Sequence, residues 1–311
     1  MVTHRAQNRS TFFYFATFGA KEINLTQYVK ESNEDWTIVI KPQSGLFDID
    51  FKELIQYRDL LYIFVRRDLM AVYKQTILGP VWFFIQPLLT TLVYAFVYGG
   101  IANIGTDGKP RLLFYLTGTV LWAYFSECLV TTSSTFTANA AVFGKVYFPR
   151  VILPLAKVIS TLFKMGIQMI LLAIAYAVYI ALGQYSFQVN GYILTLPLLI
   201  IIMANLGLGA GMIVTSMTIK YRDLQYLVAF GVQLLMFAAP VVYPLSRFHG
   251  KMLLLLKLNP VSAVIETFRA AVLGGVVDWP MLGYSFIVST ILLLIGFLIF
   301  NKAEKSFIDT V

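Results

Sequence analysis

The sequence predicts an all-α integral membrane protein with six transmembrane helices, an N-terminal amphipathic interface helix, and re-entrant helices between spans five and six. Two observations lead to this fold class. Hydrophobic residues make up 58% of the 311-residue chain and charged residues only 13%, about half the charged share of a soluble domain. The apolar residues also gather in long runs, each near the ~20 residues needed to cross a bilayer. The six predicted spans are 78–101, 112–136, 154–182, 192–217, 225–243 and 281–301.

An amphipathic helix is predicted over 51–77, directly before the first span. At about 100° per residue its charged residues share one arc and its apolar residues the opposite one. The charged arc consists of Lys52, Asp59, Arg66, Arg67 and Lys74, and the apolar arc of Leu54, Tyr57, Leu61, Phe64, Val65, Leu69 and Val72. Arg58 and Asp68 interrupt the apolar arc. A basic amphipathic helix lies along a membrane surface. Here it either anchors the chain or acts as a lever that transmits a cytoplasmic event to the spans.

The stretch 244–280, between spans five and six, is too apolar for an ordinary loop and too interrupted for a span. Its apolar pieces, 252–256 and 263–277, are broken by Lys257, Asn259-Pro260, Glu266 and Arg269. Short, broken apolar pieces are typical of helices that enter the membrane without crossing it or lie at its interface. We therefore expect re-entrant or interfacial helices here.

The distribution of lysine and arginine predicts that both termini are cytoplasmic, because cytoplasmic loops carry an excess of these residues. With the N-terminus inside, 16 of the 24 fall on the cytoplasmic side and six outside, and the other two lie within the third span. Residues 1–50 then form a cytoplasmic extension, in which 36–41 suits a short strand, and 78–311 form the six-span domain.

Several function classes are excluded by motifs that the sequence lacks. A P-loop has the pattern GxxxxGK, and none of the Gly-Lys pairs, at Gly108, Gly144 and Gly250, has a glycine five residues earlier. The two histidines and the single cysteine, Cys128, form no cluster that suits a metal. The net charge of +8 follows from membrane topology and does not indicate nucleic-acid binding. We expect no catalytic residue, metal or cofactor on this chain, so energy for any work must come from another chain or from an ion gradient.

Three ionisable residues fall inside predicted spans, where such residues are candidates for function. They are Glu127 in the second span and Lys157 and Lys164 in the third. Spans two and three run antiparallel, so Glu127 and Lys164 should sit at similar depth. Pairing them would offset part of the cost of holding charge in lipid. The alternative is that each side chain extends separately to the inner surface.

Aromatic residues make up 15% of the chain. Their faces stack on sugar rings without requiring charge, which would suit a pore for neutral or varied sugars. The candidates for lining such a polymer channel are Trp82, Phe83, Tyr94, Trp122, Phe125, Phe230 and Phe237. The alternative for each is packing between helices or a place in an aromatic belt at the membrane interface.

Two ordered sets of short motifs occur along the chain. The first set comprises Arg58-Asp59-Leu60-Leu61, Arg67-Asp68, Tyr73-Lys74, Leu78-Gly79, Trp82 and Pro87. The second comprises Tyr221-Arg222-Asp223, Pro240-Val241-Val242-Tyr243-Pro244, Asn259-Pro260, Arg269 and Leu273-Gly274. Together they cover about 47–311, and in type and order they resemble the motifs of the ABC-2 permeases of bacterial polysaccharide export.

The resemblance implies a multi-pass permease of the bacterial cytoplasmic membrane that pairs with a second copy of itself. Two copies of a separate ABC ATPase subunit would bind ATP and Mg²⁺ and supply the energy. The complex would export an O-antigen, capsule or teichoic-acid polysaccharide linked to undecaprenyl diphosphate, with membrane lipid as a further partner. The rival expectations are an ABC-2 permease for a small lipid or drug, and a stand-alone membrane scaffold or scramblase.

The resemblance also implies where the partners bind. In such permeases the amphipathic helix and the loop between spans two and three contact the ATPase. The residues expected there are Arg58, Asp59, Asp68, Ala140, Phe143, Lys145 and Tyr147. The pyrophosphate of the lipid is expected beside Arg66, Arg67, Lys74, Leu78 and Gly79. Arginine suits phosphate because it donates paired hydrogen bonds, and Gly79 leaves the backbone open to close approach. The alternative is that these cations only hold the helix on anionic lipid.

Overall fold

The computed structural model describes residues 55–74, 79–143, 148–221 and 223–308, all of which belong to one compact unit, Gly45–Val311. These residues form helices joined by turns, and no strand occurs among them. The all-α prediction is therefore confirmed for this part of the chain. The predicted extension 1–50, with its short strand, lies outside the described residues.

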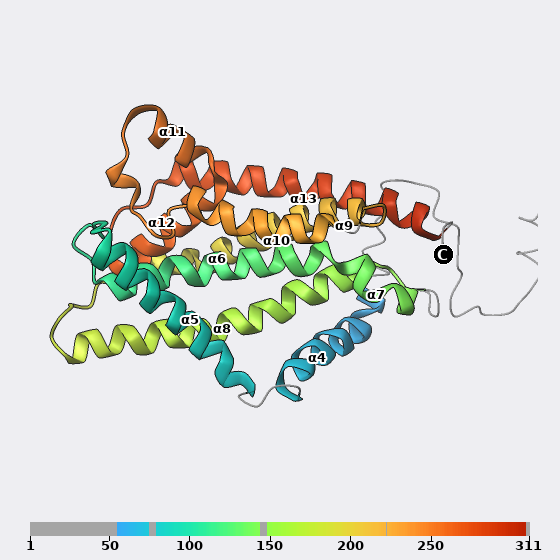
Figure 1. Ribbon diagram of the computed structural model, residues 1–311, viewed down its shortest axis with the longest axis horizontal. Helices are drawn as coiled ribbons and strands as arrows, with labels where there is room; N and C mark the ends of the chain where they lie inside the picture. Colours follow the sequence, from blue (N-terminus) through green and yellow to red (C-terminus); the bar gives the residue numbers. More distant parts are fainter. Residues whose placement is uncertain (1–54, 75–78, 144–147, 222, 309–311) are drawn as a thin grey trace, which may run out of the picture. The chain divides into compact units, whose positions relative to one another are not determined.

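The elements follow one another in a simple order (Figure 1). The N-terminal half contains α4 (Arg58–Lys74), η1 (Gly79–Val81), α5 (Trp82–Tyr94), the π-helical η2 (Ala95–Ile101), α6 (Arg111–Ser133), α7 (Thr135–Phe143) and α8 (Ile152–Ala181). The C-terminal half contains η3 (Gly191–Thr195), α9 (Leu196–Thr218), α10 (Leu224–Leu235), η4 (Met236–Ala238), η5 (Leu245–Arg247), α11 (Gly250–Leu258), α12 (Pro260–Leu273) and α13 (Trp279–Ile308). Helices α11 and α12 lie at one end of the bundle, here called the α12 end, and α7 lies at the other, the α7 end.

Five helical segments in the described residues are long and apolar enough to cross a membrane. They are Trp82–Ile101, Arg111–Ser133, Ile152–Ala181, Gly191–Thr218 and Trp279–Ala303. Each coincides with one of the predicted spans to within a few residues. The apolar run-lengths in the sequence were thus sufficient to locate these five helices.

The predicted span 225–243 is shorter in the structure. Its helical part is Leu224–Ala238, and the chain then becomes extended at Ala239, with φ −114° and ψ 148°. Pro240 is the reason, because proline lacks the N–H that would continue the helix and disfavours helical backbone in the residue before it. The residues after it form no regular helix until η5, which leads into the short helices α11 and α12.

Helix α6 forms the centre of the bundle, with most of its side chains buried. It packs against α8 on one side and α9 on another, and α9 in turn packs against α13. Lipid supplies no hydrophobic force between helices, so such contacts depend on small residues that let backbones approach. Three glycines of α9 provide this surface.

The glycines of α9 alternate between two neighbours. A Cβ atom on Gly207 would lie 2.6 Å from Cβ of Cys128, and one on Gly211 would lie 2.5 Å from Cβ of Thr132, both on α6. A Cβ atom on Gly209 would lie 2.8 Å from the backbone of Leu292 on α13. These distances leave no room for a side chain, so α9 is held between α6 and α13 by its glycines.

Gly211→Val should therefore destabilise the fold, because the added methyl groups must displace Thr132 and the α6 backbone behind it. Overpacking of this kind costs about 1–3 kcal/mol, and we expect the melting temperature in detergent to fall by several degrees. Gly166→Val on α8 is the matched control, because no atom lies within 4 Å of a Cβ built there. Equal losses in the two variants would contradict this account of the α6–α9 contact.

Candidate functional site

Helix α4 lies against α8, and its two faces divide as the sequence predicts. Phe64 and Val65 are buried. Tyr57, Leu61 and Leu69, from the same arc, are partly buried against the core. The described members of the charged arc, Asp59, Arg66, Arg67 and Lys74, are all exposed. The apolar arc of this helix therefore faces α8 within the same chain.

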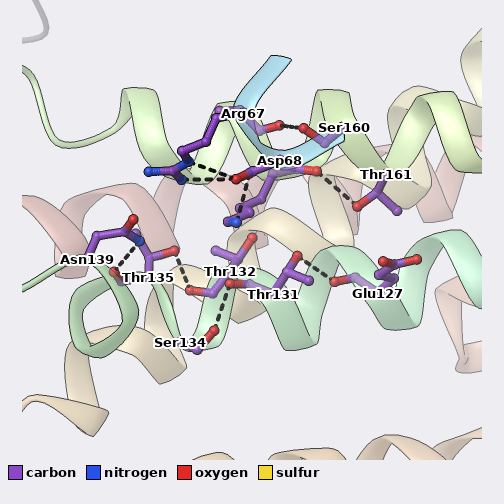
Figure 2. A network of polar contacts seen from close by, with 12 residues as sticks. Arg67, Asp68, Glu127, Thr131, Thr132, Ser134, Thr135, Asn139, Ser160 and Thr161 are labelled. Atoms are coloured by element: carbon purple, nitrogen blue, oxygen red, sulfur yellow. Dashed lines mark hydrogen bonds and ion pairs between the residues drawn. The ribbon is translucent and has the colours of Figure 1, made fainter. Parts of the chain in front are cut away.

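Asp68 interrupts the apolar arc because it pairs with a cation on α8. Its Oδ2 atom lies 2.8 Å from Nζ of Lys157, and its Oδ1 atom accepts a hydrogen bond of 3.0 Å from Arg67 Nη2. The Arg67 guanidinium also lies over the ring of Phe64, 4.9 Å from its centroid. Figure 2 shows the resulting network at the crossing of α4 over α8. Lys157, predicted as a charge within the third span, thus anchors α4.

The other two predicted intramembrane charges form a second ion pair. Lys164 Nζ on α8 donates a hydrogen bond to Glu127 Oε1 on α6. The same ammonium group lies 5.5 Å from the ring centroid of Phe83, the second residue of α5. Glu127 and Lys164 are therefore paired in the structure and do not extend separately to the inner surface. The pair brings α5, α6 and α8 together at one point.

A run of hydroxyl residues leads from α6 into α7 (Figure 2). Thr131, Ser133, Ser134, Thr135 and Thr137 each donate to a backbone carbonyl three or four residues earlier. Such back-bonding satisfies the hydroxyls within the helix and tends to bend it. The backbone leaves helical geometry at Ser134 (φ −100°, ψ 7°) and again at Asn139 (φ −119°, ψ 15°). Helix α7 is therefore set off from α6 by a bend.

The loop predicted between spans two and three is helical over its first part. Ala140 and Phe143 lie in α7, whereas Lys145 and Tyr147 lie outside the described residues. Phe136 of α7 stacks on Phe300 of α13 with centroids 4.8 Å apart. Thr137 is 2.5 Å from Gln225 Nε2 of α10. These contacts tie α7 to two later helices, and the sequence held no signal for Gln225 because its partner is 88 residues away.

The residues predicted beside a pyrophosphate have different surroundings. Arg67 is engaged by Asp68, whereas Arg66 faces a groove between α4 and α8. Lys74 is exposed in the last turn of α4. Gly79 is buried and has φ +50°, a conformation that favours glycine. Leu78 lies outside the described residues.

Some of the aromatic residues predicted to line a channel are exposed and others are buried. Trp82, Phe230 and Phe237 are exposed on α5, α10 and η4. Trp122 and Phe125 are buried in the core, with their rings 5.3 Å apart. Tyr94 donates a hydrogen bond of 3.2 Å to Met236 Sδ, and Phe83 lies beside Lys164. Three of the seven therefore present free aromatic surface in this chain.

Comparison with known proteins agrees with this arrangement. The model of a family described as ABC-2 type transporter matches residues 59–273. The chain belongs to this family. It is 25% identical to an O-antigen export system permease protein of Klebsiella pneumoniae over 252 residues. This alignment covers 81% of this chain and 94% of that relative. It is 29% identical over 221 residues to one of Myxococcus xanthus, covering 70% and 82%. It is 22% identical to a polysialic acid transport protein of Escherichia coli, covering 78% and 93%.

In this ABC-2 transporter chain, two motifs of the second set meet where Arg269 of α12 contacts Pro240 and Val241. Its Nη2 atom donates to the carbonyl oxygens of Pro240 and Val241, at 2.8 and 3.2 Å. Its Nη1 atom donates to Glu266 Oε1 at 2.6 Å, and the guanidinium lies 3.7 Å from the ring centroid of Phe114 on α6. Arg269 therefore satisfies the carbonyls freed where Pro240 ends the helix.

One further motif residue, Asn259, and Gly118 of α6 complete this junction. Asn259 accepts a hydrogen bond from Val261 N at 3.1 Å, which caps α12, and donates one of 2.9 Å to Ala238 O. Gly118 of α6 gives the junction room, because a Cβ there would lie 2.9 Å from Val241 O. The sequence analysis found Asn259 only as part of a motif and did not single out Gly118. Their roles depend on contacts between distant segments.

A polar cavity of about 390 Å³ lies beside Arg269 at the α12 end. Its charged lining residues are Asp107, Lys109, Lys257, Glu266, Arg269 and Asp278. The hydrogen bond of 3.0 Å from Lys257 Nζ lowers the pKa of the Asp278 carboxyl, and the backbone N–H of Met281, at 3.2 Å, lowers it further. Asp278 thereby caps the start of α13.

The Glu127–Lys164 pair can be tested by a double-mutant cycle. Glu127→Gln or Lys164→Met alone strands the other charge, and we expect each to lower the free energy of unfolding by roughly 1–3 kcal/mol. This is less than for a fully buried pair, because the two side chains are 33% and 20% exposed. The double variant should recover part of the loss.

The control for this cycle is Asp59→Asn, which removes a pair with Arg58 at 3.8 Å in which both side chains are at least 80% exposed. Pairs of this kind contribute little, so its stability should stay near that of the parent. Strictly additive losses in the Glu127 and Lys164 cycle would refute a coupled pair.

Proposed function

We propose that this chain is the permease subunit of an ABC transporter that exports a polysaccharide linked to undecaprenyl diphosphate across the bacterial cytoplasmic membrane. The observation that carries this proposal is the family match together with relatives named as O-antigen export permeases over most of their length. The motif residues of that family also form the junction at Arg269, which suggests that the chain keeps the family's working architecture.

The proposal includes a division of labour between subunits. Two copies of this chain form the translocation path, and two copies of a separate ATPase bind ATP and Mg²⁺. The 311-residue sequence contains no P-loop pattern, which agrees with an energy source on a different chain. No cofactor is assigned to the permease itself.

In the proposed topology the α7 end faces the cytoplasm, as the lysine and arginine distribution favours. Six membrane crossings are proposed, and α10 together with η4 forms the one that is not among the five long helices. Its 15 residues, Leu224–Ala238, rise about 22 Å at ~1.5 Å per residue, short of the ~30 Å hydrocarbon core. The turn residues that follow Ala238 complete the path. Helices α11 and α12 then enter from the outer side without crossing.

The proposed contact surface for the ATPase comprises α4 and α7. Its candidate residues are Arg58, Asp59, Ala140, Phe143, Lys145 and Tyr147. Asp68 faces α8 and is placed to transmit movement of α4 through Lys157. Helix α7 is linked to α10 through Gln225 and to α13 through Phe300. A displacement of α4 or α7 by the ATPase would thus be transmitted to several membrane spans.

The proposed entry point for the lipid head group is the junction between α4 and α5. Lys74 supplies an exposed cation, and Gly79, although buried in this chain, has no side chain that would block a phosphate from its backbone. Leu78 lies between them in sequence, and Arg66 and Arg67 are on the preceding turns of α4. The exposed aromatics Trp82, Phe230 and Phe237 are candidates for the polymer path between two copies.

Lys74→Gln tests the head-group assignment. A diphosphate is costly to bring to an apolar path without a cation, so we expect export to fall about tenfold or more while lipid-linked polymer accumulates on the cytoplasmic side. Lys74→Arg should restore export. The control is Arg247→Gln, which removes an exposed cation at the α12 end. Normal export by Lys74→Gln would rule out this role.

Phe143→Asp tests whether the ATPase subunit docks against α7. If α7 docks against an ATPase, a charge at this position should weaken co-purification of that subunit severalfold and reduce stimulation of its activity by lipid-linked glycan. Membrane insertion and melting temperature of the permease alone provide the folding control. Unchanged co-purification would count against α7 as the docking element, and no co-purification with the parent chain would overturn the proposed function.

A further inference from the structure

A groove of about 540 Å³ runs between α4 and α8. Its lining consists of apolar side chains from both helices and two arginines of α4, Arg58 and Arg66. No acidic side chain lines it. The groove is separate from the α4–α5 junction, because neither Lys74 nor Gly79 contributes to it.

Helical periodicity explains how α4 builds this groove. Leu61, Val65 and Leu69 are spaced by four residues and form the inner row next to α8. Arg58, Tyr62, Arg66 and Met70 have the same spacing and form the outer row. The two arginines are therefore about 12 Å apart along the helix axis. Tyr62 is midway between them in the outer row.

The wall formed by α8 consists of Ile159 and Phe163, which lie in a candidate membrane span. Large apolar side chains remain uncovered here: Phe163 is 56% exposed and Tyr62 66% exposed. An apolar surface of a membrane helix is suited to a lipid chain. A basic rim next to it is suited to an anionic lipid head group.

The charges on α4 are arranged to keep the rim positive. Asp68, the acid closest to Arg66 on the helix, is turned toward Lys157 and does not line the groove. Arg66 forms no ion pair with any residue that the structure describes. Arg58 lies 3.8 Å from Asp59, but both side chains are at least 80% exposed, so this pair is weak in water. Both guanidinium groups are thus available to a phosphate.

We propose that this groove is a binding site for an anionic phospholipid of the surrounding membrane. An acyl chain occupies the apolar rows, and Arg58 and Arg66 donate hydrogen bonds to the phosphate. The bound lipid fills the space between α4 and α8 beside the Asp68–Lys157 pair, and so sets how firmly α4 is held. The inference does not depend on the proposed transport substrate.

The test uses the full-length chain in nanodiscs of phosphatidylcholine with or without phosphatidylglycerol. Met70→Trp places a fluorescent reporter on the groove, and brominated acyl chains on one lipid at a time quench it on contact. Brominated phosphatidylglycerol should quench the reporter at a severalfold lower mole fraction than brominated phosphatidylcholine. A basic residue near an anionic surface supplies about a fivefold preference. Adding Arg58→Gln and Arg66→Gln should bring the two lipids to equal quenching.

Matched variants separate this site from general surface charge. Lys74→Gln, on the same helix but outside the groove, should leave the preference intact. A tryptophan at Ile63, which is exposed but does not line the groove, should report no preference. Tyr62→Trp is the second groove reporter if Met70→Trp fails to fold. Fluorescence of the native tryptophans is subtracted using the parent chain.

Two results would overturn the proposal. Equal quenching of the groove reporter by both lipids in the parent background would show that the arginines do not select a phosphate. No quenching by either lipid would show that protein fills the groove, either a second copy or another segment of this chain.

Discussion

A charge held within a membrane must be paired, and this constraint determines how the helices of this protein are joined. Hydrocarbon offers no water to an unpaired ion, so each charged residue among the spans needs a partner on another segment. Asp68 and Lys157 join α4 to α8, and Glu127 and Lys164 join α6 to α8. Arg269 joins α12 to the turn that follows α10 and η4. The polar contacts therefore specify helix neighbours that apolar packing alone leaves undetermined.

Close backbone approach supplies the second part of the architecture. Gly207, Gly209 and Gly211 let α9 lie directly against α6 and α13, with no space for a Cβ at any of the three. Gly118 does the same where α6 meets the Arg269 junction. The ion pairs and the glycine contacts involve different helix pairs, since α8 and α4 carry the charges and α9 carries the glycines. The two sides of α6 are thus held by different kinds of interaction.

The sequence predicted the features that depend on local periodicity and length. Five spans, the faces of α4 and the similar depth of Glu127 and Lys164 all follow from spacing along the chain. It did not predict the contacts of Arg269 with Pro240 and Val241, or of Gln225 with Thr137, because these link residues far apart in the sequence. The span at 225–243 was predicted too long because its apolar composition continues past Pro240, whereas the helix cannot. Sequence spacing also placed Arg66 and Arg67 together, although Asp68 engages only Arg67.

Helix α6 connects the two ends of the molecule, and its geometry decides how movement would pass between them in the proposed exporter. From Phe114, beneath Arg269, to Ser133 it is a continuous helix, about 29 Å at ~1.5 Å per residue. The bend at Ser134 then separates it from α7, which itself bends again at Asn139. At this bend the Ser134 hydroxyl donates to Thr131 O, and the Thr135 hydroxyl of α7 donates to Thr132 O of α6, so a hydrogen bond spans the bend. The contacts of α7 with Gln225 and Phe300 lie beyond the bend. The backbone N–H of Phe136 also donates to Thr215 Oγ1 of α9 at 3.4 Å, so a displacement of α7 would reach α9, α10 and α13 through contacts of their own and α6 through the bend.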